Sequence, residues 1–131
     1  MQAAFLRVKL KYLDEENNMR RDIAKHYLER IKNPRIVLPD SNVFGNHVWH
    51  LFVVRCDNRS NFQQYLAEKN IQTIIHYPVA PHNQAAYKNL KHLTLPITEK
   101  IHQEVISLPI SQVIATNDVL EIVEAVNEFQ S

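Results

Sequence analysis

The fold is decided by one central stretch, residues 47–77, which reads HVWHLFVVRCDNRSNFQQYLAEKNIQTIIHY. Residues 47–56 are dense in β-branched and aromatic side chains and precede an Asp-Asn stop, so they predict a strand. Residues 59–69 carry apolar side chains at helical spacing, and residues 71–77 predict a second strand closed by Pro78. We therefore expect a sheet with a helix packed on it.

The chain beyond this unit predicts shorter elements and one amphipathic helix. Helical turns are expected at residues 83–91 and 98–104, an extended stretch at 93–97 and a third strand at 105–108. Thr116 is placed to cap a last helix, whose apolar face carries Val119, Leu120, Val123, Val126 and Phe129. Together these elements predict an α+β (two-layer α/β) fold of three to four short, mainly antiparallel strands with helices packed on them.

Toward the N-terminus, residues 3–32 lack Gly and Pro and predict one long helix, which a loop at residues 33–46 follows. At 1.5 Å rise per residue the helix measures about 45 Å, longer than a compact domain of this size can cover. Apolar side chains form two adjoining stripes along it: Leu6, Leu10, Leu13, Ala24, Leu28 and Ile31 in one, Phe5, Val8, Tyr12, Met19, Ile23 and Tyr27 in the other. We expect the helix to overhang its domain, to be covered by a preceding part of the protein, and to make the isolated chain self-associate across a two-fold axis.

The composition bounds what the chain does. Its 131 residues suffice for a single domain, and its formal net charge of +1 provides no field that would draw it to nucleic acid or to a membrane surface. The single cysteine, Cys56, excludes an internal disulfide and indicates a reducing compartment, the cytoplasm. No apolar run approaches the ~20 residues that cross a bilayer. One glycine, Gly45, is too few for a phosphate-cradling loop, so we expect any cofactor to be held elsewhere.

Seven histidines raise the question of a metal site. His47 and His50 are three apart on the predicted strand, whose alternation sends them to opposite faces, so we do not expect them to share an ion. Cys56 ends the same strand with no basic neighbour beyond Arg55, which favours a buried, inert thiol over a nucleophile.

Residues 75–87, IHYPVAPHNQAAY, are the most informative stretch for function. They place His76, Tyr77 and His82 on a loop that leaves the end of a predicted strand, where a rigid support can present polar side chains to a ligand. The prolines restrict the backbone and so lower the entropic cost of binding. The alternative is structural: Tyr77 continues the inward face of the strand as core, and His76 caps the strand end. The spacing leaves both interpretations open.

Three stretches together resemble a known family: the opening QAAFLRVKLKYLDEEN, residues 47–87, and the late SLPIS ahead of the final helix. They are similar to the C-terminal part of sugar-nucleotide aminotransferases of the DegT/DnrJ/StrS group, in the family's order and over essentially the whole chain. The matching positions include His50, Ile71, Thr73, His76, Tyr77 and Pro78. The likeness is closest to enzymes that aminate a 3-keto-6-deoxyhexose attached to dTDP.

The resemblance implies a fold-type-I homodimer that depends on pyridoxal phosphate and passes an amino group from glutamate to the keto sugar. A large N-terminal domain would bind the cofactor. Residues 1–131 would form the smaller C-terminal domain, and residues 1–32 would link the two. None of the eight lysines stands in the family's Ser/Phe-rich lysine motif, so we expect the chain alone to bind no cofactor and to be inactive.

The resemblance also implies a substrate site. His76 and Tyr77 would reach toward the hexose and its diphosphate, and His82 would support the same loop, although VAPHNQ departs from the family's more usual PLH-containing version. Imidazole and phenol groups are donors that suit sugar hydroxyls and phosphate oxygens.

Two other interpretations stay open. The first is a stand-alone, non-catalytic binding or regulatory module derived from such an enzyme. The second is an unrelated ferredoxin-like α+β ligand-binding domain, which requires the long helix to pack within its own domain.

Overall fold

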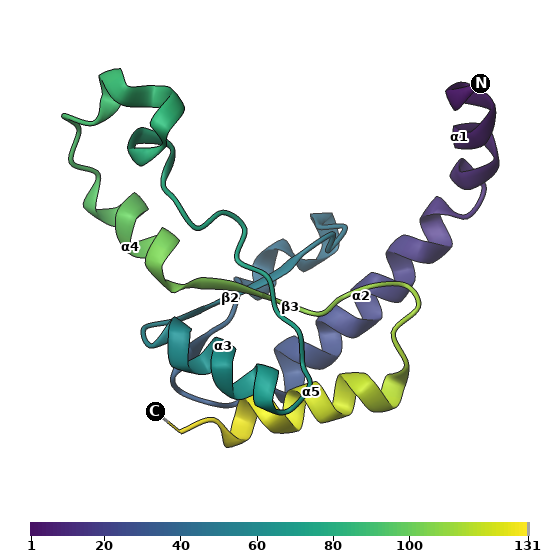
Figure 1. The fold of residues 1–131 in the computed structure, drawn as a ribbon. Helices are drawn as coiled ribbons and strands as arrows, with labels where there is room; N and C mark the ends of the chain where they lie inside the picture. Colours follow the sequence, from purple (N-terminus) through teal and green to yellow (C-terminus); the bar gives the residue numbers. More distant parts are fainter. Residues whose placement is uncertain (131) are drawn as a thin grey trace.

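The computed structural model of the chain describes residues 1–130 and has an α+β fold (Figure 1). Its helices are α1 (Gln2–Leu10), α2 (Leu13–Arg30), α3 (Arg59–Glu68), α4 (Pro96–Glu104) and α5 (Thr116–Glu128). Its strands are β1 (Ile36–Val37), β2 (Phe52–Cys56) and β3 (Val105–Leu108), with 3-10 helices η1 (Ser41–Asn46), η2 (Pro81–Asn83) and η3 (Ala85–Leu90). Figure 1 shows the sheet at the centre and residues 77–95, which we call the arm, projecting away from it.

The three strands form an antiparallel sheet in the order β1-β2-β3. Ile36 pairs with Cys56 across β1 and β2, and Phe52 pairs with Leu108 across β2 and β3. Every second residue of β2 is buried, because alternate side chains of a strand face opposite sides of a sheet. The predicted α+β class with short antiparallel strands is confirmed.

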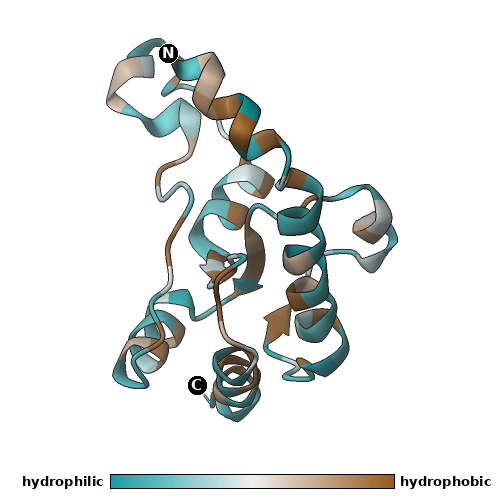
Figure 2. Cartoon of the chain, turned by 90° about the vertical axis from the view of Figure 1, so that its right-hand side faces the viewer, coloured by the Kyte–Doolittle hydropathy of each residue, from teal (hydrophilic) through white to brown (hydrophobic). Residues whose placement is uncertain are grey.

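The core lies between the sheet and three helices. Buried side chains of α2, α3 and α5 form it together with the strands: Ile23, Ala24, Tyr27, Phe62, Leu66, Val119, Ile122, Val123, Ala125 and Val126. The rings of Tyr27 and Phe52 meet edge to face with centroids 4.9 Å apart, and the Tyr27 hydroxyl donates a 2.7 Å hydrogen bond to the Pro109 carbonyl. Figure 2 shows hydrophobic residues concentrated in the strands and on the helix sides that face them.

The long helix predicted at residues 3–32 is wrong in its continuity, because the chain turns between α1 and α2. The amides of Lys11 and Tyr12 donate to carbonyls three residues back, to Val8 at 3.3 Å and to Lys9 at 3.0 Å. Such bonds tighten the helix, so α1 ends there and α2 begins in a new direction.

The predicted overhang of this region is confirmed. α1 buries none of its residues, and Phe5, Leu6 and Leu10 are 65–66% exposed. A helix that packs so little within its own domain argues against the ferredoxin-like alternative. Among residues 1–130, no helix combines the length and the apolar character needed to cross a membrane.

The strand predicted at residues 47–56 begins only at Phe52. Trp49 has a φ of 52°, in the left-handed region, and its amide donates to His47 Nδ1 at 2.9 Å, so the chain turns before β2. The buried Trp49 ring packs 5.5 Å from that of Phe52, and this packing holds the turn in place. His47 and His50 therefore flank a turn, and strand alternation does not separate them.

The strand predicted at residues 71–77 is also wrong, because only Ile74 pairs, in an isolated bridge with Ser107. The two residues exchange backbone hydrogen bonds of 3.4 and 2.8 Å. The segment is therefore tied to the outer edge of β3 at one point.

Smaller differences concern boundaries. The loop predicted at residues 33–46 contains β1 and η1, and the helix predicted at 83–91 is η3 preceded by η2. α4 begins at Pro96, inside the stretch predicted to be extended. Thr116 is the first residue of α5, and Ala115 occupies the cap position without a side-chain hydrogen bond. α3 and β3 lie where they were predicted.

Candidate functional site

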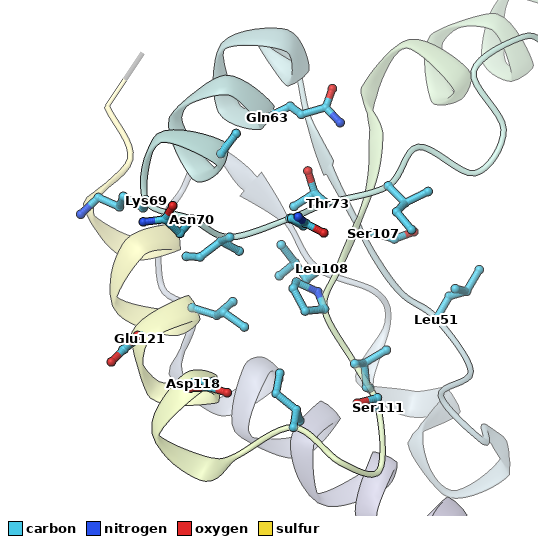
Figure 3. Close-up of a pocket in the computed structure, with 18 of the residues that line it drawn as sticks. Leu51, Gln63, Lys69, Asn70, Thr73, Ser107, Leu108, Ser111, Asp118 and Glu121 are labelled. Carbon is cyan, nitrogen blue, oxygen red and sulfur yellow. The ribbon is translucent and has the colours of Figure 1, made fainter.

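A groove of about 1150 Å³ opens beside the outer edge of β3 (Figure 3). Its lining comes from α3, the segment at residues 69–76, β3 with the loop after it, and α5. Polar side chains of this lining include His50, Gln63, Thr73, His76, Ser107, Ser111, Asp118 and Glu121. A groove of this size can take a ligand larger than a single sugar ring.

His76 lies in this groove. Its Nδ1 is 2.9 Å from the hydroxyl oxygen of Ser107, a residue buried in β3. The backbone bridge between Ile74 and Ser107 joins the same two segments. Ser107 therefore holds this segment at two residues, Ile74 through its main chain and His76 through its side chain.

Tyr77 stands beside His76 but points outward. Its side chain is 71% exposed, and its ring meets the His76 ring edge-on with centroids 6.2 Å apart. The peptide bond between the two residues is cis. The interpretation of Tyr77 as core is therefore wrong, and a ligand can reach its hydroxyl.

His82 lies apart from the other two. It is only 3% exposed, it does not line the groove, and its Nε2 donates to Glu99 Oε1 at 3.0 Å. The same carboxylate oxygen accepts the Leu95 amide at 2.9 Å, and these two bonds lower the pKa of Glu99, the backbone bond more than His82. The structure thus brings His76 and Tyr77 together and places His82 inside the arm, against α4.

Charges divide the groove into two parts. Asp118 and Glu121 belong to α5, whereas His50 precedes β2 and His76 is hydrogen-bonded to Ser107 of β3. Carboxylates repel phosphate oxygens, and imidazoles donate hydrogen bonds to them. An anionic ligand is therefore favoured at the histidine end.

Lys69 is the one lysine among the described residues that line the groove. Its Nζ lies 2.8 Å from Glu128 Oε2 and 5.3 Å from the centroid of the Tyr65 ring. The hydrogen bond with Glu128 raises the pKa of Lys69, which keeps the amine protonated. A Schiff-base lysine must instead lose its proton before it attacks a carbonyl carbon. Lys69, paired with Glu128 as it is here, is therefore not set up to form a Schiff base with pyridoxal phosphate.

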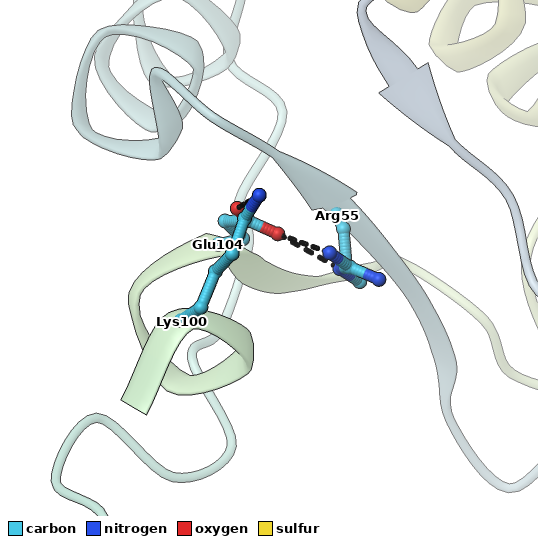
Figure 4. A network of polar contacts seen from close by, with 3 residues as sticks. All are labelled: Arg55, Lys100 and Glu104. Carbon is cyan, nitrogen blue, oxygen red and sulfur yellow. Dashed lines mark hydrogen bonds and ion pairs between the residues drawn. The ribbon is translucent and has the colours of Figure 1, made fainter. Parts of the chain in front are cut away.

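A polar network joins α4 to the sheet next to this site (Figure 4). Arg55 Nη2 and Nε donate to Glu104 Oε2 at 2.6 and 2.9 Å, and Lys100 Nζ lies 3.5 Å from Glu104 Oε1. Burial acts to raise the pKa of Glu104, but the hydrogen bonds and nearby cations outweigh it, so the pKa is lowered. The network fixes the point at which α4 becomes β3.

Cys56 is buried in the sheet, and burial raises the pKa of its thiol. A buried thiol with a raised pKa is a poor nucleophile, as predicted. Within residues 1–130, no three His, Cys, Asp or Glu side chains gather as a metal-binding group.

The serines of the groove escaped the sequence prediction. In the sequence, SLPIS marks the resemblance to the family without assigning a role to its serines. Ser107 interrupts an otherwise apolar strand, and a buried hydroxyl needs a hydrogen-bond partner, so this position is the signal that could have pointed to His76.

Comparison with known proteins places these features in a family. Residues 1–127 match the model of the DegT/DnrJ/EryC1/StrS aminotransferase family. The dTDP-3-amino-3,6-dideoxy-alpha-D-galactopyranose transaminase of Aneurinibacillus thermoaerophilus is 56% identical over 129 residues, which are 98% of this chain and 36% of the relative. The dTDP-3-amino-3,4,6-trideoxy-alpha-D-glucose transaminase of Streptomyces venezuelae is 36% identical over 132 residues, 98% of this chain and 35% of the relative.

Solved structures agree with the sequence relatives. Streptomyces venezuelae DesV, in complex with a ketimine intermediate, superposes with a TM-score of 0.88 at 36% identity, over 98% of this chain and 35% of DesV. NtdA from Bacillus subtilis, with bound cofactor PMP, gives a TM-score of 0.80 at 28% identity, over 88% of this chain and 28% of NtdA. This chain thus spans about a third of the length of the relatives, whose family depends on pyridoxal phosphate. The chain belongs to the DegT/DnrJ/EryC1/StrS aminotransferase family.

Proposed function

We propose that residues 1–131 are the C-terminal small domain of an aminotransferase that transfers an amino group from glutamate to a keto-deoxysugar linked to dTDP. One juxtaposition supports this proposal above all. His76 lines a large groove and the exposed Tyr77 stands beside it, in a chain that is 56% identical to a dTDP-amino-sugar transaminase.

In this proposal His76 and Tyr77 bind the sugar nucleotide. His76 uses Nδ1 toward Ser107, so a ligand would meet its Nε2, and the exposed Tyr77 hydroxyl is available as a second donor. Both groups suit hydroxyls and phosphate oxygens. His82 supports their loop from inside the arm, consistent with its burial against Glu99. The diphosphate lies away from the carboxylates of α5.

The cofactor is held by residues outside this chain in the proposed enzyme. When bound there, pyridoxal phosphate supplies the electron sink for amino transfer. The paired and protonated Lys69 supports this assignment, because it leaves the groove without a reactive amine. The exposed apolar side chains of α1 are suited to contact a cofactor domain and the second subunit of a homodimer.

The experiment that tests the proposal is a chimeric enzyme in which this chain replaces the matching third of the Aneurinibacillus transaminase. We expect the chimera to bind pyridoxal phosphate and to aminate the keto-sugar nucleotide that this transaminase uses. The change His76→Ala should cost about 1–3 kcal/mol of transition-state stabilisation, seen as a lower kcat/KM, because polar groups of the substrate lose their partner. The cofactor absorption should not change.

The matched control is His92→Ala, since His92 is exposed on the arm and does not line the groove. A His76→Ala chimera with full activity, or one that no longer binds the cofactor, would contradict the substrate-site assignment. The 131-residue chain is tested separately with pyridoxal phosphate and borohydride. Trapping at one specific lysine would contradict the proposal that this chain carries no Schiff-base residue.

A further inference from the structure

One face of α4 holds the arm at two points. Glu99 and His102 are three residues apart on the helix, so they lie on the same face. Glu99 accepts a hydrogen bond from His82, and His102 Nδ1 lies 2.7 Å from the carbonyl oxygen of Tyr77. A carbonyl oxygen only accepts, so Nδ1 of His102 carries the proton.

The same support continues into the sheet. β3 follows α4 directly, and its residue Ser107 holds His76. The support itself is firmly placed, because Arg55 binds Glu104 (Figure 4). In addition, Nη1 of Arg59 donates to the carbonyl of His102. α4 and β3 therefore form one continuous support. It contacts residues 76–82 at three points, where Glu99 meets His82, His102 meets Tyr77 and Ser107 meets His76.

The position of Tyr77 depends on this support more than the positions of His76 and His82 do. Its side chain is mostly exposed, so packing contributes little to its position, whereas His76 and His82 are held through their own rings. The main-chain bond from His102 is then the contact that fixes the backbone of Tyr77, from which the exposed side chain projects. A segment whose backbone is ordered before the ligand arrives loses less entropy on binding.

We propose that His102 is a positioning residue for the substrate site: its Nδ1–H, bonded to the Tyr77 carbonyl, holds the backbone of Tyr77 in the position from which the tyrosine side chain meets the sugar nucleotide. The inference rests on the proposed function, because it takes Tyr77 to be a substrate ligand. His102 itself does not line the groove and acts through Tyr77.

The first test uses the 131-residue chain in solution. His102→Leu removes the donor, and His102→Asn keeps one, since the Asn amide nitrogen can take the place of Nδ1. In NMR relaxation measurements we expect His102→Leu to raise the backbone mobility of Tyr77 and Val79, and His102→Asn to restore it. The matched control is His92→Leu, which should leave these residues as in the parent chain. Unchanged mobility in His102→Leu would overturn the proposal.

The second test places the same changes in the chimeric enzyme described above. His102→Leu should raise the KM for the sugar nucleotide about 2- to 10-fold, the effect of one hydrogen bond, with kcat changed less than KM. His102→Asn should return KM toward the parent value, which a merely structural loss would not do.

The variant Tyr77→Phe distinguishes a failure of the positioning role of His102 from a failure of the proposed function. If Tyr77→Phe raises KM and His102→Leu does not, the positioning role is wrong and the proposed function stands. If neither Tyr77→Phe nor His76→Ala affects kcat or KM, the proposed function fails, and the inference drawn from it fails as well. A parallel rise of KM in Tyr77→Phe and His102→Leu, with rescue by His102→Asn, supports both.

Discussion

Glu104 is a charged group in an almost buried position, and its ionisation links stability to pH. Its pKa is lowered in the folded chain, so the folded state favours the ionised form more than the unfolded state does. The resulting stabilisation is present above the ordinary pKa of a glutamate and is lost as the pH falls through the lowered value. Arg55 is the partner that makes this ionisation favourable.

We expect Glu104→Gln to lower the free energy of unfolding by about 1–3 kcal/mol at pH 7, since charge-assisted hydrogen bonds are lost. The penalty should shrink as the pH falls from 7 through the lowered pKa, because the parent carboxyl then becomes neutral as well. Urea unfolding at pH 7 and at a series of lower pH values measures it, with the exposed Glu124→Gln as control. An equal penalty at every pH of the series would show that the charge of Glu104 is not its source.

Cys56 gives a prediction of chemical reactivity. The thiol is buried and its pKa is raised, so little thiolate forms at neutral pH. We expect a chromogenic disulfide reagent to modify Cys56 only after urea unfolds the chain. Rapid labelling of the folded chain would mean that β2 opens to solvent.

At the scale of elements, prediction succeeded where burial alone sets the pattern. α3, β3 and α5 each pack an apolar face on the core, so their periodicity was readable. The prediction of a strand failed over residues 47–51, because the burial of Trp49 imposes a turn that the local composition does not reveal. Residues 71–77 alternate like a strand, but β3 offers only one bridge to pair with them.

The candidate site, too, could be predicted from the sequence only in part. Proximity of His76 and Tyr77 follows from their being neighbours in the sequence, and the prolines around them marked a constrained loop. The partners of these residues lie 25 and 31 positions away, at His102 and Ser107. Contacts at such separations depend on how α4 and β3 fold back, which one sequence does not reveal.

α1 yields a prediction about stability. It buries no residue, and an isolated helix of 9 residues is marginal in water. Deleting residues 1–10 should therefore change the free energy of unfolding by less than about 0.5 kcal/mol, measured in urea at dilution where the chain is monomeric. A larger loss would reveal contacts of α1 with the core.

On the scale of the whole molecule, the exposed apolar side chains of the N-terminal region lead us to expect self-association. Phe5, Leu6, Val8 and Leu10 are each more than half exposed on α1. Soluble monomers rarely leave such a contiguous patch uncovered. We expect the isolated chain to self-associate through α1 at micromolar concentration.

Sedimentation checks this expectation with a matched pair of variants. Leu6→Asp combined with Leu10→Asp should shift the chain toward monomer, because charges on the patch oppose its burial. Val113→Asp, which changes an apolar residue that is 84% exposed on the loop before α5, should leave the association intact. A parent chain that sediments as a monomer would contradict the pairing of α1.

The two contacts of α4 to the arm also have an evolutionary consequence. η3 follows the two arm residues that α4 contacts, Tyr77 and His82. The residues of η3 are mostly exposed and contribute nothing to the core. Insertions, deletions and substitutions in residues 88–94 can therefore accumulate without moving Tyr77 or His82. Proteins descended from one ancestral domain can thus change the surface at the tip of the arm that contacts a neighbouring molecule. The residues at the base of the arm, Tyr77 and His82, keep their positions.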